Sequence, residues 1–345
     1  MPTLFITGGA GFIGSAFVRL ILKERPTYQI VNFDALTYAG NLDNLVGLDP
    51  HRHRFVRGDI EIREQVLENL PEGCDAIINF AAESHVDRSI LSAHEFLRTN
   101  IIGTQVLLDA ARERNVRRFL QVSTDEVMGS LENGQHFFTE NSPFAPNSPY
   151  AASKAAAEHF VRAATHTFGV DTVITRCGNN YGPRQFPEKF LPLAISNALN
   201  DEPIPVYGDG ENVRDWIYVN DHCSAILRAL ENGASGAVYN IGARNQRRNI
   251  DVVESLLEAL GKPKTLIRFV KDRPGHDRRY AIDPTLVETE LGWHPEETWE
   301  TGLEKTIRWY VENTEWLERA RSGAYRDYYK RQYGTEGNDP RNRTN

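Results

Sequence analysis

The sequence predicts an α/β protein in which a doubly wound parallel sheet is followed by a smaller C-terminal lobe. Apolar strand-like segments alternate with helical periodicity through the first half of the chain. The 345 residues exceed the roughly 100–200 residues of one typical domain, so we expect a second unit. Prolines divide the following stretch into short, loop-rich segments, at Pro183, Pro187, Pro192, Pro203 and Pro205.

The elements of the first half succeed one another as strand, helix and strand. We expect strands at residues 4–7, 29–33, 55–57, 76–80, 119–122 and 171–175. We expect helices at residues 12–24, 92–114 and 150–168. Parallel strands need a crossover of a dozen or more residues, so this spacing favours a parallel sheet. Ligands of such sheets bind beyond the carboxyl ends of the strands.

Helical periodicity returns in the second half over residues 219–230, 250–260 and 301–313. Tyr207-Gly208-Asp209-Gly210 is a turn signal between these helices and the proline-rich stretch. We expect a first domain at residues 1–180 and a second lobe at 181–334, with some of its segments returning to the first domain. Residues 335–345 form a polar tail.

Composition excludes several classes of partner. The net charge is −8 and the basic residues are scattered, which argues against nucleic acid or an acidic membrane. Cys74, Cys177 and Cys223 are too few and too far apart for a disulfide framework or a metal site, so we expect no metal and a reducing cytoplasm. The chain begins with a strand-like segment, and no window approaches the roughly 18 apolar residues of a membrane span.

Glycines recur at Gly8, Gly11 and Gly14, after the first predicted strand and at the start of the first helix. This pattern is typical of a dinucleotide cradle, because the pyrophosphate approaches the backbone closely and the helix N-terminus supplies free N–H groups. An ordinary tight turn is the alternative for the glycines alone. In this strand–turn–helix context we expect a Rossmann-type domain, with the smaller lobe binding the substrate.

Asp34 follows the second predicted strand, twenty residues beyond Gly14. A carboxylate there accepts hydrogen bonds from ribose hydroxyls and repels a 2′-phosphate, so NAD is favoured over NADP. Asp59 follows the third strand, where it can contact the adenine. A helix N-cap is an equally compatible role for Asp59.

Two further groups carry chemistry. Tyr150 and Lys154 lie four residues apart on one face of a predicted helix, and the ammonium is expected to lower the phenol pKa towards neutrality. Asp125 and Glu126 follow an apolar strand, and one carboxyl can donate a proton while its neighbour accepts one. A surface pair and a solvated turn are the respective alternatives.

The chain resembles the extended short-chain dehydrogenase/reductase superfamily, and within it the dTDP-glucose 4,6-dehydratase family. The resemblance covers nearly the whole chain. It rests on residues 8–14, 36–41 (LTYAGN), 81–89 (AAESHVDRS), 123–127 (STDEV), 179–183 (NNYGP) and 273–277 (RPGHD). The glycine motif is shared by the superfamily, whereas the Thr124-Asp125-Glu126 triplet and the segment at 81–89 are more specific to this family. Met128 and Gly178 depart from the family pattern, which usually has a tyrosine and a serine or cysteine there.

The resemblance implies a set of ligand contacts. NAD is expected at Gly8, Gly11, Phe12, Ile13, Gly14, Asp34, Ala35, Leu36, Thr37, Asp59, Ile60, Ala81, Ala82, Thr99, Tyr150, Lys154 and Asn180. The nucleotide-sugar is expected at Ser84, Thr124, Asn179, Lys189, Phe190, Pro205, Tyr207, Arg214, Asn249, Asp272, Arg273 and His276. Lys189 and Arg214 suit a diphosphate, although each basic residue taken singly is also compatible with a surface charge.

The resemblance also implies the reaction of dTDP-glucose. Tyr150 would deprotonate the C4 hydroxyl as hydride leaves for NAD, with Thr124 bonded to the C4 oxygen. Glu126 would then remove the C5 proton and Asp125 would protonate the departing C6 hydroxyl, before hydride returns to C6. The catalytic set is therefore Thr124, Asp125, Glu126, Tyr150 and Lys154, and the product is a 4-keto-6-deoxy sugar of the kind that leads to rhamnose or another deoxysugar.

Three alternatives remain open from the sequence. A nucleotide-sugar epimerase shares the cradle, the tyrosine and the lysine. It eliminates no water, however, so it does not need Asp125 and Glu126 as a further acid and base. A dehydratase acting on another nucleotide-sugar differs only in its substrate lobe, and a regulatory NAD-binding module would have kept the fold without the chemistry. The superfamily resemblance further implies a homodimer in which the long helices at 92–114 and 150–168 pack against a second copy.

Overall fold

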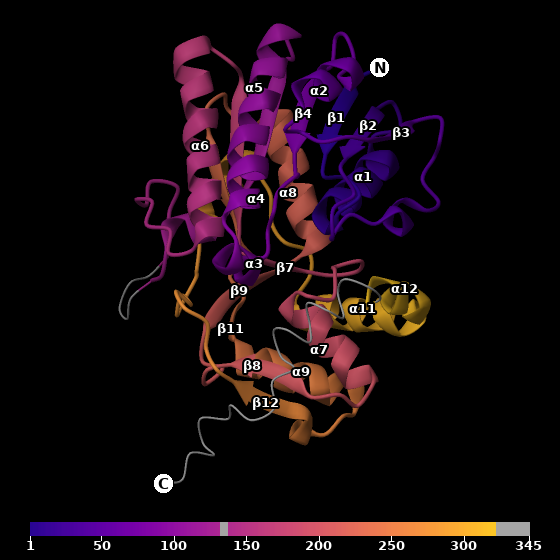
Figure 1. Cartoon of the computed structure of the whole chain (residues 1–345), viewed down its shortest axis with the longest axis vertical. Coiled ribbons are helices and arrows are strands. Elements are labelled where there is room, and N and C mark those ends of the chain that lie inside the picture. Colours follow the sequence, from indigo (N-terminus) through magenta and orange to yellow (C-terminus); the bar gives the residue numbers. More distant parts are fainter. Residues whose placement is uncertain (132–136, 322–345) are drawn as a thin grey trace.

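A computed structural model of the protein describes residues 1–131 and 137–321, and its first layer is a parallel sheet. The strand order is β10-β6-β5-β4-β1-β2-β3, and every neighbouring pair is parallel (Figure 1). The strands are β1 (Thr3–Thr7), β2 (Gln29–Asp34), β3 (His53–Arg57), β4 (Ala76–Asn79), β5 (Arg118–Thr124), β6 (Thr172–Cys177) and β10 (Val238–Ile241). The predicted fold class is confirmed, and all six predicted strands are present.

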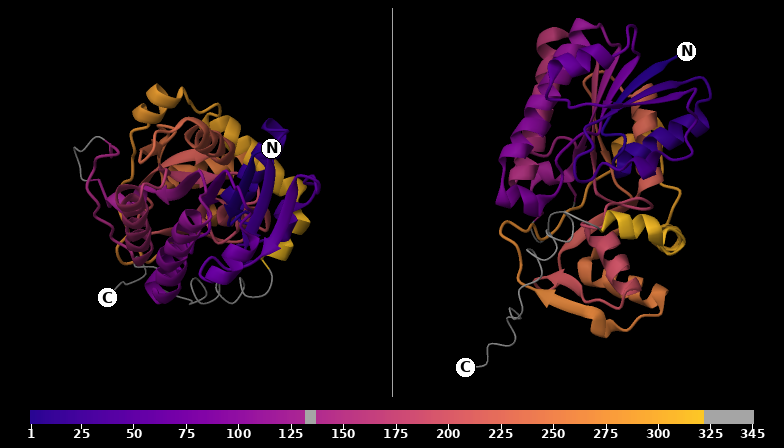
Figure 2. Two further views of the ribbon diagram at one scale, coloured as in Figure 1. Left: turned by 90° about the horizontal axis from the view of Figure 1, so that it is seen from above. Right: turned by 45° about the vertical axis from the view of Figure 1, so that its right-hand side comes forward.

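Helices cover both faces of this sheet because successive strand side chains point to opposite sides. Leu4 and Ile6 pack with α1, α8 and α10, whereas Phe5 packs with α2, α5 and α6. The helices of the first face are α1 (Phe12–Glu24), α8 (Val219–Asn232) and α10 (Thr285–Leu291). Those of the second face are α2 (Arg63–Asn69), α5 (Thr104–Glu113) and α6 (Pro149–Phe168), which Figure 2 shows on the opposite side of the sheet.

The helix predicted over residues 92–114 is interrupted in the structure. It consists of α4 (His94–Phe96), a π-helical segment (Leu97–Gly103) and α5, and it is preceded by α3 (Val86–Leu91). Asn100 lies within the π-helical segment, where its amide accepts from the Glu83 N–H at 2.9 Å and donates to the Glu83 carbonyl at 3.0 Å. A wider turn brings this side chain to the end of β4, and such π-helical turns often occur at functional sites.

The second lobe lies beyond the carboxyl ends of the sheet (Figure 1). Its strands are β7 (Asn179–Tyr181), β9 (Val213–Tyr218) and β11 (Gln246–Arg248) in one sheet and β8 (Ile204–Tyr207) and β12 (Ile267–Val270) in another. Its helices are α7 (Phe190–Leu199), α9 (Asn249–Leu260), α11 (Trp299–Glu312) and α12 (Thr314–Ala320). Tyr181, Trp216 and Trp299 form the aromatic centre of its core.

The chain crosses between the two units more than once, because α8 and β10 follow the start of the second lobe yet pack with the first sheet. The polar tail expected at 335–345 lies outside the described residues. Within the described part of the chain, no helix is both long and apolar enough to cross a membrane.

A buried ion pair joins the sheet to α6. Arg176 on β6 bonds both carboxylate oxygens of Glu158, at 2.8 to 3.2 Å, and the Ser123 hydroxyl donates to the same carboxylate at 2.6 Å. Both charged side chains are almost wholly buried. The Arg176 guanidinium also donates to the Glu140 carbonyl at 3.1 Å, so four segments of the chain meet at this ion pair.

We predict that Glu158→Gln lowers the free energy of unfolding by about 3–5 kcal/mol, because it leaves Arg176 charged, buried and without its counter-ion. Urea denaturation of the full chain measures the change. Asp251→Asn is the matched control, since it breaks the exposed Arg248–Asp251 pair and should leave the unfolding midpoint unchanged. Equal midpoints for Glu158→Gln and the parent protein would contradict the prediction.

Candidate active site

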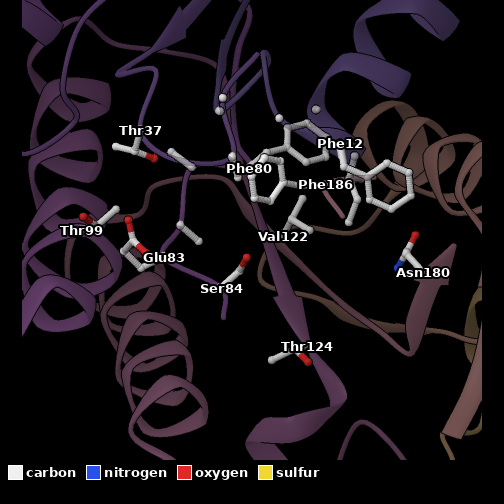
Figure 3. A pocket seen from close by; sticks show the side chains of 18 of the residues that line it. Phe12, Thr37, Phe80, Glu83, Ser84, Thr99, Val122, Thr124, Asn180 and Phe186 are labelled. Atoms are coloured by element: carbon white, nitrogen blue, oxygen red, sulfur yellow. The ribbon is translucent and has the colours of Figure 1, made fainter. Parts of the chain in front are cut away.

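One pocket runs along the carboxyl ends of the sheet strands at β1 and β4, where the strand order reverses direction. Such a switch point is the expected ligand site of a doubly wound sheet. In Figure 3, Thr37 and Thr99 lie at one end, Phe12, Phe80 and Val122 near the middle, and Asn180 at the other end. The residues expected to contact NAD all line this pocket except Leu36.

The glycine cradle has the geometry that its sequence predicts. Gly8 has a φ of +70°, and a Cβ there would lie 2.6 Å from the Ala81 nitrogen, so a larger residue is excluded. A Cβ at Gly14 would clash with the Gly8 carbonyl oxygen. Helix α1 has Gly11 as its N-cap and no side-chain cap, so its first N–H groups remain available to an anion.

The carboxylate of Asp34 is fixed by the backbone around it. Oδ2 accepts from the Ala10 N–H at 2.9 Å and Oδ1 accepts from the Leu36 N–H at 2.8 Å. Burial raises its pKa, although these two bonds counteract the effect. Each oxygen retains an acceptor site. The cradle and this carboxylate therefore fit the pyrophosphate and ribose of NAD, and Leu36 contributes its backbone although its side chain lies outside the pocket.

Asp59 also lines the pocket, but it does not cap a helix. Helix α2 begins at Arg63 after Ile62, without a side-chain cap, while Asp59 Oδ1 accepts from the Glu61 N–H at 2.9 Å. The alternative role for Asp59, as the N-cap of a helix, is therefore wrong, because the chain makes a further turn between Asp59 and the start of α2.

Helix α6 carries Tyr150 and Lys154 into the pocket. Ser148 caps the helix by accepting from the Ala151 N–H at 3.1 Å, and Lys154 Nζ donates to the Val122 carbonyl of β5 at 2.7 Å. Burial lowers the pKa of Lys154 to about 8.

The pKa of Tyr150 is raised well above its usual range, first by burial and then by the charge of Glu126. The predicted lowering of this pKa is wrong, because burial and the charges of Glu126 and Asp125 raise it. A hydrogen bond with Thr124 acts in the opposite direction and favours the phenolate.

The acid pair follows β5 directly. The Thr124 hydroxyl accepts from the Glu126 N–H at 3.2 Å and lies 3.3 Å from Asp125 Oδ1. Burial, followed by the Glu126 charge, raises the pKa of Asp125 well above its usual range. Burial also raises the pKa of Glu126, whereas the Arg273 and Arg214 charges lower it. Burial therefore favours the protonated form of Asp125, while two arginine charges favour the ionised form of Glu126.

Asp125 Oδ2 is buried and has no hydrogen-bond partner among residues 1–131 and 137–321. A protonated carboxyl with one free oxygen in a pocket can donate to a ligand atom. The arrangement thus offers one acid and one base side by side, next to a phenol.

The expected nucleotide-sugar contacts separate into two groups. Ser84, Thr124, Asn179 and Lys189 line the pocket, and Lys189 Nζ donates to the Ser84 carbonyl at 2.6 Å. The others lie outside its lining, on the second lobe, at Phe190, Pro205, Tyr207, Arg214, Asn249, Asp272, Arg273 and His276. Arg214 and Arg273 are nevertheless close enough for their charges to act on Glu126.

Sequence reasoning missed several lining residues. Glu83 is the most notable, because burial raises its pKa to about 6 and it stands between two predicted residues. Its position after β4 was a signal that was available. The remaining missed residues are Phe33, Ala39, Gly40, Phe80, Val122, Ser123, Cys177, Gly178, Gln185, Phe186 and Glu188.

The two departures from the family pattern have structural settings. Met128 packs in an apolar cluster with Leu131 and Phe138, and its Sδ lies 3.8 Å from an Arg176 nitrogen. At Gly178 a Cβ would lie 2.6 Å from the Asp215 carbonyl oxygen, so β9 approaches the backbone too closely for a side chain. Both positions flank the acid pair rather than replacing any member of it.

The three cysteines are buried and unpaired. No group of three or more His, Cys, Asp or Glu side chains that could hold a metal occurs in the described ranges.

A dinucleotide cradle, a tyrosine and lysine on one helix and a buried acid pair define the class: an extended short-chain dehydrogenase/reductase. The family model described as GDP-mannose 4,6 dehydratase matches residues 5–306. A dTDP-glucose 4,6-dehydratase from Xanthomonas campestris pv. campestris is 50% identical over 94% of this chain and 98% of the relative.

Solved structures agree with this match. A dTDP-glucose 4,6-dehydratase from Streptomyces venezuelae, solved with NAD bound, superposes with a TM-score of 0.89 and 48% identity over 92% of this chain and 99% of that one. A UDP-glucose 4-epimerase from Thermotoga maritima reaches 0.83 and 30% identity over 90% and 99%. The chain belongs to the GDP-mannose 4,6 dehydratase family of the extended short-chain dehydrogenase/reductases, on the branch that holds the dTDP-glucose 4,6-dehydratases.

We predict that Asp125→Asn stabilises the protein increasingly as the pH rises from about 4. A carboxyl with a raised folded-state pKa contributes its full stability below the unfolded-state pKa and loses it as the pH rises through the folded-state pKa. The asparagine does not titrate, so the difference in Tm should widen and then level off. Thermal unfolding at a series of pH values measures it.

Asp49→Asn is the control, because Asp49 is exposed and its hydrogen bond from Arg52 lowers its pKa. Because the pKa of Asp49 is lowered, any change in its difference in Tm should have the opposite sign, with asparagine losing stability relative to the parent protein as the pH rises through about 4. A constant difference for Asp125→Asn would show that the pKa of Asp125 is the same in the folded and unfolded protein, which would contradict the prediction.

Proposed function

We propose that the protein is an NAD-dependent hydro-lyase that converts dTDP-glucose to dTDP-4-keto-6-deoxyglucose. The buried Asp125–Glu126 pair beside Tyr150 carries this proposal, because elimination of water needs an acid and a base in addition to the group that acts at C4. An epimerase has no such need. The relatives that are about half identical over almost the entire chain support the same activity.

NAD would be held by the cradle at Gly8 to Gly14, by Asp34 and by the wall that includes Thr99 and Asn180. The Asn180 amide is oriented for this, since its Oδ1 accepts from His222 Nδ1 at 2.8 Å and its Nδ2 donates to the Gly178 carbonyl at 3.2 Å. When bound, NAD supplies a hydride acceptor at C4 of the sugar and a hydride donor at C6.

The proton transfers fall to the protein. Tyr150 takes the C4 hydroxyl proton, and Thr124 bonds the C4 oxygen. A ketone at C4 acidifies the C5 proton, which Glu126 removes. Asp125, whose pKa is raised further above its usual range, protonates the departing C6 hydroxyl so that it leaves as water. Lys154, whose pKa burial lowers to about 8, lines the same pocket one helical turn after Tyr150, and its charged form would favour the ionised phenol.

The nucleotide would extend from the pocket into the second lobe. Lys189, Arg214 and Arg273 are suited to the diphosphate, and Pro205 and Tyr207 to the pyrimidine. In this assignment residues 1–180 mainly bind NAD and residues 181–334 mainly bind the nucleotide-sugar. The product is a precursor of 6-deoxysugars such as rhamnose.

We also propose a homodimer formed by the paired helices α5 and α6 and the π-helical segment before α5. Large apolar side chains project from these helices, among them Leu97, Ile102 and Phe160, which are 48%, 52% and 43% exposed. Apolar side chains grouped on adjacent helices are typical of a protein interface. The buried, unpaired cysteines support a reducing cytoplasm as the place of action.

We expect dTDP-glucose labelled with deuterium at C4 to give a 4-keto product that has lost one water and kept the label at C6. No reduced cofactor should accumulate, because the hydride removed from C4 is the one returned to C6. Mass spectrometry and NMR of the product measure both. UDP-glucose and GDP-mannose in parallel test the choice of nucleotide.

Two results would contradict the reaction. A product inverted at C4 without loss of water would indicate an epimerase. Exchange of the label with solvent would show that the hydride is not retained between the two steps.

We expect light scattering after size exclusion to give twice the mass of one chain, and Phe160→Asp to reduce it towards one chain. A charged residue in an apolar interface costs far more than at the surface. Val311→Asp is the matched control, because Val311 is 49% exposed on α11, away from α5 and α6. A monomeric parent protein would refute the proposed dimer.

A further inference from the structure

Asp87 bridges the two units of the protein at the rim of the site. It lies in α3, in the first domain, and its side chain is almost fully buried. Its Oδ1 accepts from Arg273 Nη1 at 3.1 Å, and its Oδ2 accepts from the Tyr207 hydroxyl at 2.9 Å. Both partners belong to the second lobe, so one carboxylate holds two side chains from two separate segments.

The bond to Asp87 leaves part of the Arg273 guanidinium for a ligand. An arginine presents its donors in a rigid fork, and fixing one terminal nitrogen fixes the direction of the others. Arg273 Nε is buried and has no hydrogen-bond partner in the part of the chain that the structure describes. A buried donor of this kind is costly unless a ligand satisfies it.

Tyr207 is held at both ends of its side chain. The hydroxyl is bound by Asp87, and the ring meets the His276 imidazole edge to face, with centroids 5.9 Å apart and an interplanar angle of 81°. His276 is itself placed by Asp272, whose Oδ1 lies 2.6 Å from His276 Nδ1. The orientation of the aromatic face is therefore set before a base arrives against it.

Asp87 makes these two bonds as a carboxylate, in which both oxygens are free to accept. Burial alone would raise its pKa, but the Arg273 charge, with His85 and the Tyr207 bond, outweighs burial and lowers the pKa below its usual value. A surface carboxylate would serve as a counter-ion for Arg273 equally well. If Asp87 served only to balance the charge of Arg273, its second bond, to the neutral Tyr207 hydroxyl, would have no explanation.

We propose that Asp87 is a positioning residue for the nucleotide of the substrate, which sets Arg273 for the diphosphate and Tyr207 for the base at the same time. The inference rests on the proposed function, since it assumes that the second lobe binds a nucleoside-diphosphate sugar. It places a determinant of nucleotide binding in the first domain, in the segment at 81–89 rather than in the second lobe.

The test separates position from charge in the full-length, NAD-loaded protein. Asp87→Ala removes both acceptors, whereas Asp87→Asn removes the charge but keeps an acceptor for Arg273. We expect Asp87→Ala to raise the KM for dTDP-glucose and the Kd for dTDP at least about tenfold, with kcat within about twofold. Asp87→Asn should change either constant by less than about threefold.

Asp209→Asn is the control, because it breaks an exposed pair with Arg278 in the same lobe and should leave both constants unchanged. Affinity for NAD should be unaltered in every variant, which also shows that each is folded. If Asp87→Ala does not fold, Asp87→Ser replaces it, since a hydroxyl is too short to reach both partners.

Parental affinity for dTDP in Asp87→Ala would overturn the inference. Equal effects in Asp87→Ala and Asp87→Asn would also overturn it, because they would show a role for charge alone. Calorimetry with dTDP needs no turnover. A protein that binds dTDP in this pattern but does not dehydrate dTDP-glucose would therefore contradict the proposed reaction and not the role of Asp87.

Discussion

The attachment of α6 to β5 is the constraint on which the site depends. The acid pair follows the end of β5, and the tyrosine and lysine lie in the first two turns of α6, so chemistry requires these elements to keep a fixed spacing. Two contacts set it: Lys154 Nζ to the Val122 carbonyl, and Ser123 to Glu158. Arg176 binds the same Glu158 from β6, so the spacing is held by a charged group that cannot move without losing its partner.

Burial then determines what the assembled groups can do. It raises the pKa of Asp125 and Tyr150 and lowers that of Lys154, so all three shift towards their neutral forms. A site of this kind is costly to fold, because ionisable groups are kept in an apolar setting. The same setting strengthens every electrostatic interaction with a reacting ligand, since water is not there to screen it. Stability is given up at the residues that we propose transfer protons.

The sequence predicted the parts that depend on neighbours along the chain. The strands, the turn at Gly8 to Gly14 and the position of Asp125 after β5 are local features, and the structure contains them. Long-range partners had no local signal: Asp87 lies 186 residues from Arg273 and 120 from Tyr207. The direction of the Tyr150 pKa was missed for a related reason, because spacing on a helix identifies a neighbouring charge but says nothing about desolvation by the fold.

The π-helical segment before α5 affects which of its side chains face the ligand pocket and which face outward. A π-helical turn accommodates one residue more than an α-helical turn, and one residue corresponds to about 100° of rotation. Thr99 can thus line the ligand pocket while Ile102, three positions later, projects 52% exposed from the opposite environment. The extra residue changes the angle around the helix axis between the side chains that face the pocket and those that face outward. Removing one residue from this segment would leave a helix, but the side chains before and after the deletion would be rotated by about 100° relative to each other.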